Sequence, residues 1–476
     1  MVTVALQTET PTIRLTESRP NRAATHFRDV EFAPGTRTAW AVGFDGVILK
    51  TVDAGKTWSR QVSGIKARLY GLQVINDMEA YACGTKGTLV KTANGGKSWQ
   101  KVKTDTSIRL VDVCFVNARL GWIAGDNGLL LRTENGGRKW HQLSTGVSSG
   151  FRRIWFDQSG KGYLVGYEGV ALRSDDRGDS WSKLETPDHL SIYGADFCED
   201  GIIHLVGSCG TILKITENGQ SVTMLPMVTT NFLRDVTFDS SGNGIAAGYG
   251  VLLKGSAGSN QWEKAQVIPN LFMQGVALND EGKGIAVGRW GAVLTSDDGG
   301  KSWTFNHELF SPDLMAVAAH ESGAAVAVGA DGWTLVKTAE SDEWVPEFTG
   351  RNKTLNAAAL DGKGRFWVVG RNGAAFRKDP GKTWRMIQLP GPADYNTVCF
   401  DKSGLGYIAG DNGMIMQTRD SGENWQVIPS PTTVDIHLIM FVDVERGYLA
   451  GEDGLIMETT NGGDSWLRHY TGTQDT

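Results

Sequence analysis

The chain has 476 residues and a formal net charge of −6 at pH 7, and it is rich in glycine (61) and tryptophan (16). No apolar run approaches the roughly 18 residues that a membrane-spanning helix needs. The first 26 residues also lack the basic start and apolar core of a secretion signal. These features predict no membrane insertion and a cytoplasmic location, or a place on a virion if the protein is virus-encoded.

Residues 1–26 form the first predicted segment, a polar N-terminal arm. Two stretches rich in Thr and Val, Val2 to Leu6 and Pro11 to Leu15, are candidates for an edge strand or a strand that closes the fold. The remaining residues, 27–476, have a different organisation and are predicted to form one repetitive domain.

From residue 27 onward one unit recurs every 40 or 41 residues. Each unit contains a glycine that ends a short apolar run and opens a tight turn, as in Trp40-Ala41-Val42-Gly43-Phe44-Asp45-Gly46. An Asp or Asn followed by Gly is typical of a β-hairpin turn. Four short strands fit in each unit, which indicates an all-β fold, a β-propeller of eleven four-stranded blades. The marker glycines are residues 43, 84, 125, 166, 207, 248, 288, 329, 370, 410 and 451.

After its third strand, a good unit has a polar box such as Thr51-x-Asp53-x-Gly55-x-Thr57-Trp58. The Asp or Asn can accept hydrogen bonds from its own turn, and the tryptophan can fill the seam between neighbouring sheets. The box is therefore interpreted as a device of the fold that does no chemistry. Its seven good copies carry Asp53, Asn94, Asn135, Asp176, Asp298, Asp420 and Asn461, with Trp58, Trp99, Trp140, Trp181, Trp303, Trp425 and Trp466.

Four units have lost parts of the box. The fifth ends in Val222 where others have tryptophan, and the sixth, eighth and ninth keep the tryptophan but lack the first hydroxyl or the glycine. We interpret these units as weak turns that their neighbours hold in place.

The segment from Gly121 to Trp140, Gly-Trp-Ile-Ala-Gly-Asp-Asn-Gly-Leu-Leu-Leu-Arg-Thr-Glu-Asn-Gly-Gly-x-x-Trp, resembles the repeat of the photosystem II stability and assembly factor family of β-propellers. As a repeat pattern the resemblance covers residues 27 to 470. It implies a non-enzymatic scaffold that binds partner proteins, with an arginine-rich patch on one face. The chain differs from that family in having eleven units where seven are usual, and the same box also marks sialidases and sortilin-type receptors.

The spacing of the units favours one closed ring of eleven blades. Nine measurable distances from a box tryptophan to the next marker glycine are each 26 residues, so none of these connections is long enough to be a linker. Because eleven exceeds the usual four to eight blades, two tandem propellers remain the alternative.

Arginines gather at the start of the predicted innermost strands and in the turns after the marker glycines. They predict a basic mouth that binds an acidic protein partner, since arginine forks onto carboxylates. The alternative is that they pair with Asp29, Asp112 and Asp235 at the rim. Nucleic acid is not expected, because the chain is net acidic and has no basic run interleaved with aromatic residues. The arginines are Arg28, Arg68, Arg109, Arg152, Arg153, Arg234, Arg289 and Arg371.

Other function classes find less support in the sequence. The arginine triad and the Arg-Ile-Pro segment of a sialidase are not recognisable, although a pair of glycosidase carboxylates is always available among 53 acidic residues. A structural component of a virion, such as a phage tail or receptor-binding part, is a further alternative. Neither the eight histidines nor the five cysteines have metal-ligand spacing, so no metal and no cofactor are predicted. Cys114, Cys198 and Cys399 are expected to be buried free thiols.

Overall fold

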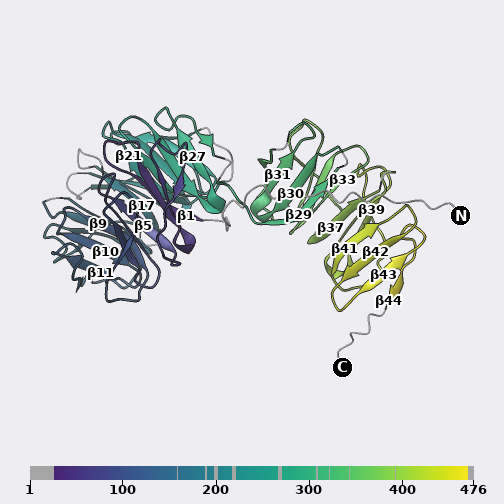
Figure 1. Cartoon of the computed structure of the whole chain (residues 1–476), viewed down its shortest axis with the longest axis horizontal. Helices are drawn as coiled ribbons and strands as arrows, with labels where there is room; N and C mark the ends of the chain where they lie inside the picture. Colours follow the sequence, from purple (N-terminus) through teal and green to yellow (C-terminus); the bar gives the residue numbers. More distant parts are fainter. Residues whose placement is uncertain are drawn as a thin grey trace, which may run out of the picture.

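The computed structural model describes residues 26–469, except 158, 188–189, 198–201, 217–220, 266–270, 307–308, 321, 342, 392 and 402. The predicted N-terminal arm lies outside the described residues, apart from His26. The described chain forms eleven four-stranded antiparallel sheets, each built from four consecutive strands (Figure 1). The all-β prediction with four strands per unit is confirmed.

We number the sheets 1 to 11 in chain order. Sheets 1 to 7 consist of β1 Phe27–Phe32, β2 Ala39–Gly43, β3 Ile48–Thr51, β4 Ser59–Arg60; β5 Leu69–Val74, β6 Ala80–Gly84, β7 Leu89–Thr92, β8 Gln100–Val102; β9 Leu110–Phe115, β10 Gly121–Gly125, β11 Leu130–Thr133, β12 His141–Leu143; β13 Phe151–Phe156, β14 Gly162–Gly166, β15 Ala171–Ser174, β16 Ser182–Lys183; β17 Ile192–Phe197, β18 Ile203–Gly207, β19 Ile212–Thr216, β20 Ser221–Met224; β21 Leu233–Phe238, β22 Asn243–Gly248, β23 Val251–Ser256, β24 Trp262–Lys264; and β25 Met273–Leu278, β26 Gly284–Gly288, β27 Val293–Ser296, β28 Thr304–Phe305.

Sheets 8 to 11 consist of β29 Leu314–Ala319, β30 Ala325–Gly329, β31 Trp333–Lys337, β32 Val345–Phe348; β33 Leu355–Leu360, β34 Phe366–Gly370, β35 Ala375–Lys378, β36 Arg385–Met386; β37 Tyr395–Phe400, β38 Gly406–Gly410, β39 Ile415–Thr418, β40 Gln426–Val427; and β41 Ile436–Phe441, β42 Gly447–Gly451, β43 Ile456–Thr459, β44 Leu467–His469. Short 3-10 turns join the second and third strands of several sheets: η1 Phe44–Gly46, η2 Ser208–Gly210, η4 Arg289–Gly291, η5 Ala330–Gly332 and η6 Asp411–Gly413. Among the described residues, no helix is both long and apolar enough to cross a membrane.

The turn between the second and third strands explains the marker glycines. In sheet 1, Asp45 and Gly46 have positive φ values of 55° and 67°, as a tight hairpin turn requires. A Cβ on Gly43 would lie 2.3 Å from the carbonyl oxygen of His26, which is the oxygen that accepts the Phe44 N–H. Only glycine allows the first strand and this turn to approach so closely.

The first strand of each sheet packs against the first strand of the next, which makes it the innermost strand. This order runs β1, β5, β9, β13, β17, β21, β25, and β25 then packs back against β1. Phe27 and Val30 share one apolar cluster with Ile285 and Val287 of sheet 7. The Asn279 side chain also donates to the Thr36 carbonyl at 3.0 Å. Sheets 1 to 7 therefore form a closed cycle of contacts.

In a single ring of eleven sheets β1 would pack against β41, whereas among the described residues β1 packs against β25. Sheets 8 to 11 follow one another through β29, β33, β37 and β41 as a second group, and Figure 1 shows the two groups side by side. The connection between sheets 7 and 8 has the same length as the others, so the spacing of the repeats could not reveal where the ring closes.

The box makes the hydrogen bonds expected from its residue types. In sheet 1, the Asp53 carboxylate accepts the Thr57 N–H at 2.9 Å and the Thr57 hydroxyl at 2.6 Å, and the Thr51 hydroxyl accepts the Gly55 N–H. A Cβ on Gly55 would lie 3.1 Å from Ile285 of sheet 7, so this box also lies against the neighbouring sheet. In the other six good boxes, the Asp or Asn two residues after the box hydroxyl also accepts a backbone N–H through its side-chain oxygen. These residues are Asn94, Asn135, Asp176, Asp298, Asp420 and Asn461.

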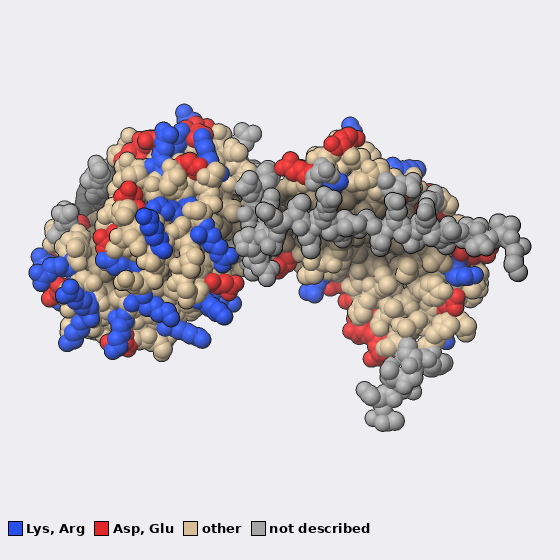
Figure 2. All heavy atoms as spheres, viewed as in Figure 1, with Lys and Arg blue, Asp and Glu red and all other residues tan. Residues whose placement is uncertain are grey.

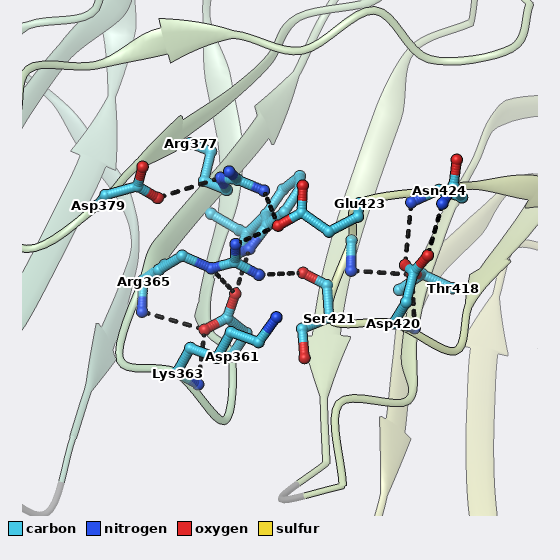
Figure 3. A network of polar contacts seen from close by, with 12 residues as sticks. Asp361, Lys363, Arg365, Arg377, Asp379, Thr418, Asp420, Ser421, Glu423 and Asn424 are labelled. Carbon is cyan, nitrogen blue, oxygen red and sulfur yellow. Dashed lines mark hydrogen bonds and ion pairs between the residues drawn. The ribbon is translucent and has the colours of Figure 1, made fainter.

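Sheets 9 and 10 are joined by a buried ionic network (Figure 3). The guanidinium of Arg365 pairs with Asp361 at 2.7 Å and with Glu423 of sheet 10 at 2.5 Å. Arg377 reaches the same Glu423 carboxylate at 3.0 Å, and its guanidinium carbon lies 5.4 Å from the centre of the Trp367 ring. One carboxylate of sheet 10 thus pairs with two buried arginines of sheet 9, each of which also pairs with an aspartate, Asp361 or Asp379.

Candidate functional site

Seven equivalent residues surround one opening of the channel at the centre of sheets 1 to 7. Each is the unpaired residue of a bulge at the start of an innermost strand, where the register with the second strand shifts by one. A bulge re-aims a side chain that would otherwise lie on one face of the sheet. These residues, which we call the mouth, are Arg28, Tyr70, Val111, Arg152, Tyr193, Arg234 and Gln274, and together with Arg153 they line a pocket of about 60 Å³.

The arginines of the mouth lie against aromatic rings. The guanidinium carbon of Arg234 is 4.3 Å from the centre of the Tyr193 ring, and its Nη2 donates to the Tyr249 hydroxyl at 2.9 Å. The guanidinium of Arg152 lies 4.5 Å from the Tyr167 ring and bonds to its hydroxyl. Such stacking holds a guanidinium in place without neutralising its charge.

The mouth carries uncompensated positive charge. In the part of the chain that the structure describes, Arg28, Arg152 and Arg234 have no carboxylate within 4.0 Å. Arg28 instead donates to the Gln274 side chain at 2.8 Å. Burial, together with the charges of Arg109, Arg234 and Arg28, lowers the pKa of Arg152 to about 10. An anion placed here would relieve this mutual repulsion.

Three more of the predicted arginines surround the mouth. Arg109 pairs with Asp126 at 2.7 Å, and its guanidinium carbon is 5.0 Å from the Tyr70 ring. Arg68 is exposed and lies 4.6 Å from the Phe44 ring, and Arg289 lies 4.9 Å from the Phe272 ring. Arg371 is also exposed, but it follows β34 in the second group of sheets and is not part of this site.

Arg153 does not belong to the open mouth. Its guanidinium pairs with Asp29 at 3.1 Å, Asp235 at 2.8 Å and Asp112 at 3.6 Å, which lie in sheets 1, 6 and 3. Arg153 thus pairs with the three aspartates that were the alternative partners, but it does so inside the channel and not at a solvated rim, because the bulge at Arg152 turns the next side chain inward. Burial acts to lower the pKa of Arg153, but the three carboxylates outweigh it and hold that pKa well above its usual value.

The three aspartates also join neighbouring sheets. Asp29 accepts the Leu72 N–H of sheet 2 at 3.0 Å, Asp112 accepts the Ile154 N–H of sheet 4, and Asp235 accepts the Val276 N–H of sheet 7. Burial raises the pKa of Asp112 to about 7. The Arg153 cluster is thus a structural centre of the ring.

Beyond Arg153, the channel widens into a cavity of about 320 Å³ whose lining is acidic, with Asp29, Glu31, Asp112, Asp196 and Asp235. Burial raises the pKa of Glu31 well above its usual value. Among the described residues, no group of three or more His, Cys, Asp or Glu side chains is arranged to hold a metal ion. The channel therefore has a basic end and an acidic end, separated by Arg153.

A search of the sequence for charged residues does not find the tyrosines of the mouth. Tyr70 and Tyr193 stand at the same repeat position as Arg28, Arg152 and Arg234. An alignment of the units by their marker glycines contains that signal. In Figure 2, Lys and Arg side chains gather over the first group of sheets on the face in view.

Comparison with known proteins places the chain near the family suggested by its repeats. Residues 92–195 and 376–475 match the family model described as photosynthesis system II assembly factor YCF48. A structure described as YCF48 bound to D1 peptide is 18% identical and covers 57% of this chain and 93% of its own, with a TM-score of 0.49. The match of these two segments to the family model confirms the resemblance that the repeats predicted.

The fold also resembles that of larger enzymes. The GH74 enzyme of Niastella koreensis is 14% identical, covers 94% of this chain and 79% of its own, and has a TM-score of 0.61. An ancestral GH74 enzyme is 13% identical over 94% of this chain and 77% of its own, with a TM-score of 0.64. A comparison with curated proteins gives no match. At these identities the GH74 likeness concerns the fold alone.

Proposed function

We propose that this distant relative of the photosystem II assembly-factor propellers is a non-enzymatic binding protein. In this proposal sheets 1 to 7 act as one propeller, and the mouth receives an acidic segment of a partner protein. The observation that carries the proposal is the set of Arg28, Arg152 and Arg234, which face one opening without a carboxylate partner among the described residues.

The neighbouring tyrosines favour a peptide over a small inorganic anion. Tyr70 and Tyr193 alternate with the arginines around the opening, so a bound chain would meet apolar ring surface as well as charge. Arginine supplies forked hydrogen bonds to carboxylates, and tyrosine is common at protein interfaces. The family match supports this direction, because an assembly factor acts on other proteins.

A glycoside-cleaving function receives less support from the site. The channel carboxylates Asp29, Asp112 and Asp235 are held by Arg153 and by backbone N–H groups of neighbouring sheets. A catalytic pair needs one carboxyl free to donate a proton and one free to attack or activate water. We therefore propose binding without catalysis.

The test is binding of a labelled oligoglutamate peptide, followed by fluorescence anisotropy. The double variant Arg152→Glu with Arg234→Glu should abolish binding, and wild-type binding should weaken as salt rises, since screening shortens the reach of the charges. Arg371→Glu is the matched control, because Arg371 is an exposed arginine of the second group. Binding that survives both the double variant and high salt would contradict the proposal.

A further inference from the structure

The second group of sheets ends in two apolar faces. On the side of sheet 8 where a preceding sheet would lie, Leu314 is 46% exposed and Val317 is 66% exposed. On the far side of sheet 11, where a following sheet would lie, Leu438 is 49% exposed and Ile456 is 38% exposed. Large apolar side chains in such numbers at two ends of one array indicate interaction surfaces.

The repeat identifies what normally covers the face of sheet 8. Leu314 and Val317 have the same places in their strand as Ile436 and Ile439 in sheet 11, judged by their pairing with the second strand. Ile436 and Ile439 are buried because they pack on sheet 10, in one cluster with Ile415. The exposed face of sheet 8 is thus equivalent to the face of sheet 11 that packs on the preceding sheet. We call such a contact between consecutive sheets a junction.

The face of sheet 11 is the other half of the same junction. Ile456 corresponds to Ile415, and both pair with the last alanine of their second strand. Leu438 corresponds to Thr397, whose hydroxyl accepts the Ile439 N–H of the following sheet. Within the array this junction forms three times, between sheets 8 and 9, 9 and 10, and 10 and 11.

The first group of sheets shows that two end faces of this kind do join. There the face of sheet 1 meets the far side of sheet 7, and the residues involved become buried: Phe27 and Val30 are 2% and 3% exposed. In the second group the same two kinds of face stand at opposite ends of four sheets. One chain leaves both faces without a partner among the described residues.

We propose that a second copy of this chain covers both faces. The far side of sheet 11 in one copy packs on sheet 8 of the other copy. A two-fold axis along the channel creates the second, identical contact, between sheet 8 of the first copy and sheet 11 of the second. Two arrays of four sheets then close into one ring of eight, a size within the usual range for propellers. Cyclic dimers are the commonest oligomers, and this arrangement closes without leaving an open end.

Light scattering coupled to gel filtration of the full chain tests the proposal, with a dimer as the expected result. Val317→Lys and Ile456→Glu should each yield monomers, because each places a charge in both junctions of the dimer. Since both side chains are exposed in one copy, each variant should still fold, with the far-UV circular dichroism of the wild type. Val427→Glu is the control: Val427 is an exposed valine of the outer strand β40, away from both faces, and this variant should stay dimeric.

Mixing the two monomeric variants distinguishes this geometry from other dimers. A mixed pair has one junction with no substitution and one in which the introduced lysine would face the introduced glutamate, so dimers should return on mixing. A monomeric wild type at all concentrations, a dimer that neither substitution affects, an open polymer, or no dimers on mixing would each overturn the proposal.

Discussion

The guanidinium of Arg153 meets the carboxylate of Asp29 across the central channel, with N–O distances of 3.1 and 3.2 Å. Arg153 lies in sheet 4 and Asp29 in sheet 1, so a contact between two side chains connects opposite parts of the ring. Asp29 in turn accepts the backbone N–H of Leu72 in sheet 2. A change at this point therefore reaches several sheets at once.

Replacing Arg153 should destabilise the first group of sheets strongly. In Arg153→Met, the buried carboxylates of Asp29, Asp112 and Asp235 lose their counter-charge, and breaking a buried ion pair in this way costs about 3–5 kcal/mol. Urea unfolding measures the loss. Arg152→Met is the matched control, since Arg152 has no carboxylate partner among the described residues, and it should cost less than about 1 kcal/mol. Equal losses in the two variants would contradict the assignment.

The pKa of Asp112 predicts how stability depends on pH. Its pKa is about 7 in the folded chain and near 3.9 when unfolded, so between these values the folded state binds more protons. The free energy of unfolding should therefore fall as pH rises from about 4 to 7. Asp112→Asn removes this titration. The free energy of unfolding of the variant, relative to that of the wild type, should therefore rise from about pH 4 to 7 and stay constant above pH 7. Parallel curves in urea titrations would rule the assignment out.

The hydrogen bonds of the box predict a modest loss for Asp53→Ala, about 1–2 kcal/mol, as for a lost turn cap. Asp53→Asn should cost much less, because Asn94 accepts the Ser98 N–H at 3.0 Å and donates to the Ser98 hydroxyl in the equivalent box. Binding of the oligoglutamate probe should not change in either variant. Loss of binding with an unchanged melting curve would mean that the box does more than hold the fold.

Glu423 should stabilise the junction between sheets 9 and 10 (Figure 3). Glu423→Gln leaves Arg377 with Asp379 and Arg365 with Asp361, so each arginine keeps one partner and the expected cost is about 1–2 kcal/mol. Glu445→Gln is the control, because Glu445 is exposed and has no ion pair among the described residues. The comparison uses thermal unfolding of the full chain, and equal melting temperatures for the two variants would contradict the role.

The thiols should react at very different rates. Cys83, Cys114, Cys209 and Cys399 are free cysteines. Cys114 is buried, as predicted, whereas Cys399 is only partly buried, and Cys198 lies outside the described residues. Burial raises the pKa of Cys114 and of Cys399 to about 12, so both should react slowly in the native protein. Cys209 is exposed in a turn and should react first, as thiol titration followed by mass spectrometry would show. Fast labelling of Cys114 would contradict its burial.

The sequence predicted the sheets well because their signals are local. The marker glycine, the Asp-Gly or Asn-Gly turn and the box lie within one unit, and each forms the expected hydrogen bonds. Ring closure depends instead on which faces meet, and equal spacing along the chain carries no information about that.

The candidate site was predicted only in part, for a related reason. Counting arginines at strand starts found Arg28, Arg152 and Arg234, which do share one opening. It also included Arg153, whose direction depends on a bulge, and Arg371, whose sheet belongs to the other group. Neither the direction of a side chain at a bulge nor the grouping of the sheets is encoded in the spacing of residues.

Every described sheet completes its backbone ladder from four consecutive strands, and none borrows a strand from the other end of the ring. The first group is therefore held shut by contacts of side chains, such as the hydrogen bond from the Asn279 side chain to the Thr36 carbonyl, 243 residues away along the chain. Such distant contacts form late in folding, because the long intervening loop must be ordered first. A newly made chain should therefore hold an open row of seven sheets, each packed on the next, before sheet 7 meets sheet 1. A mechanical pull between sheets 1 and 7 would part these two sheets while every ladder stays intact.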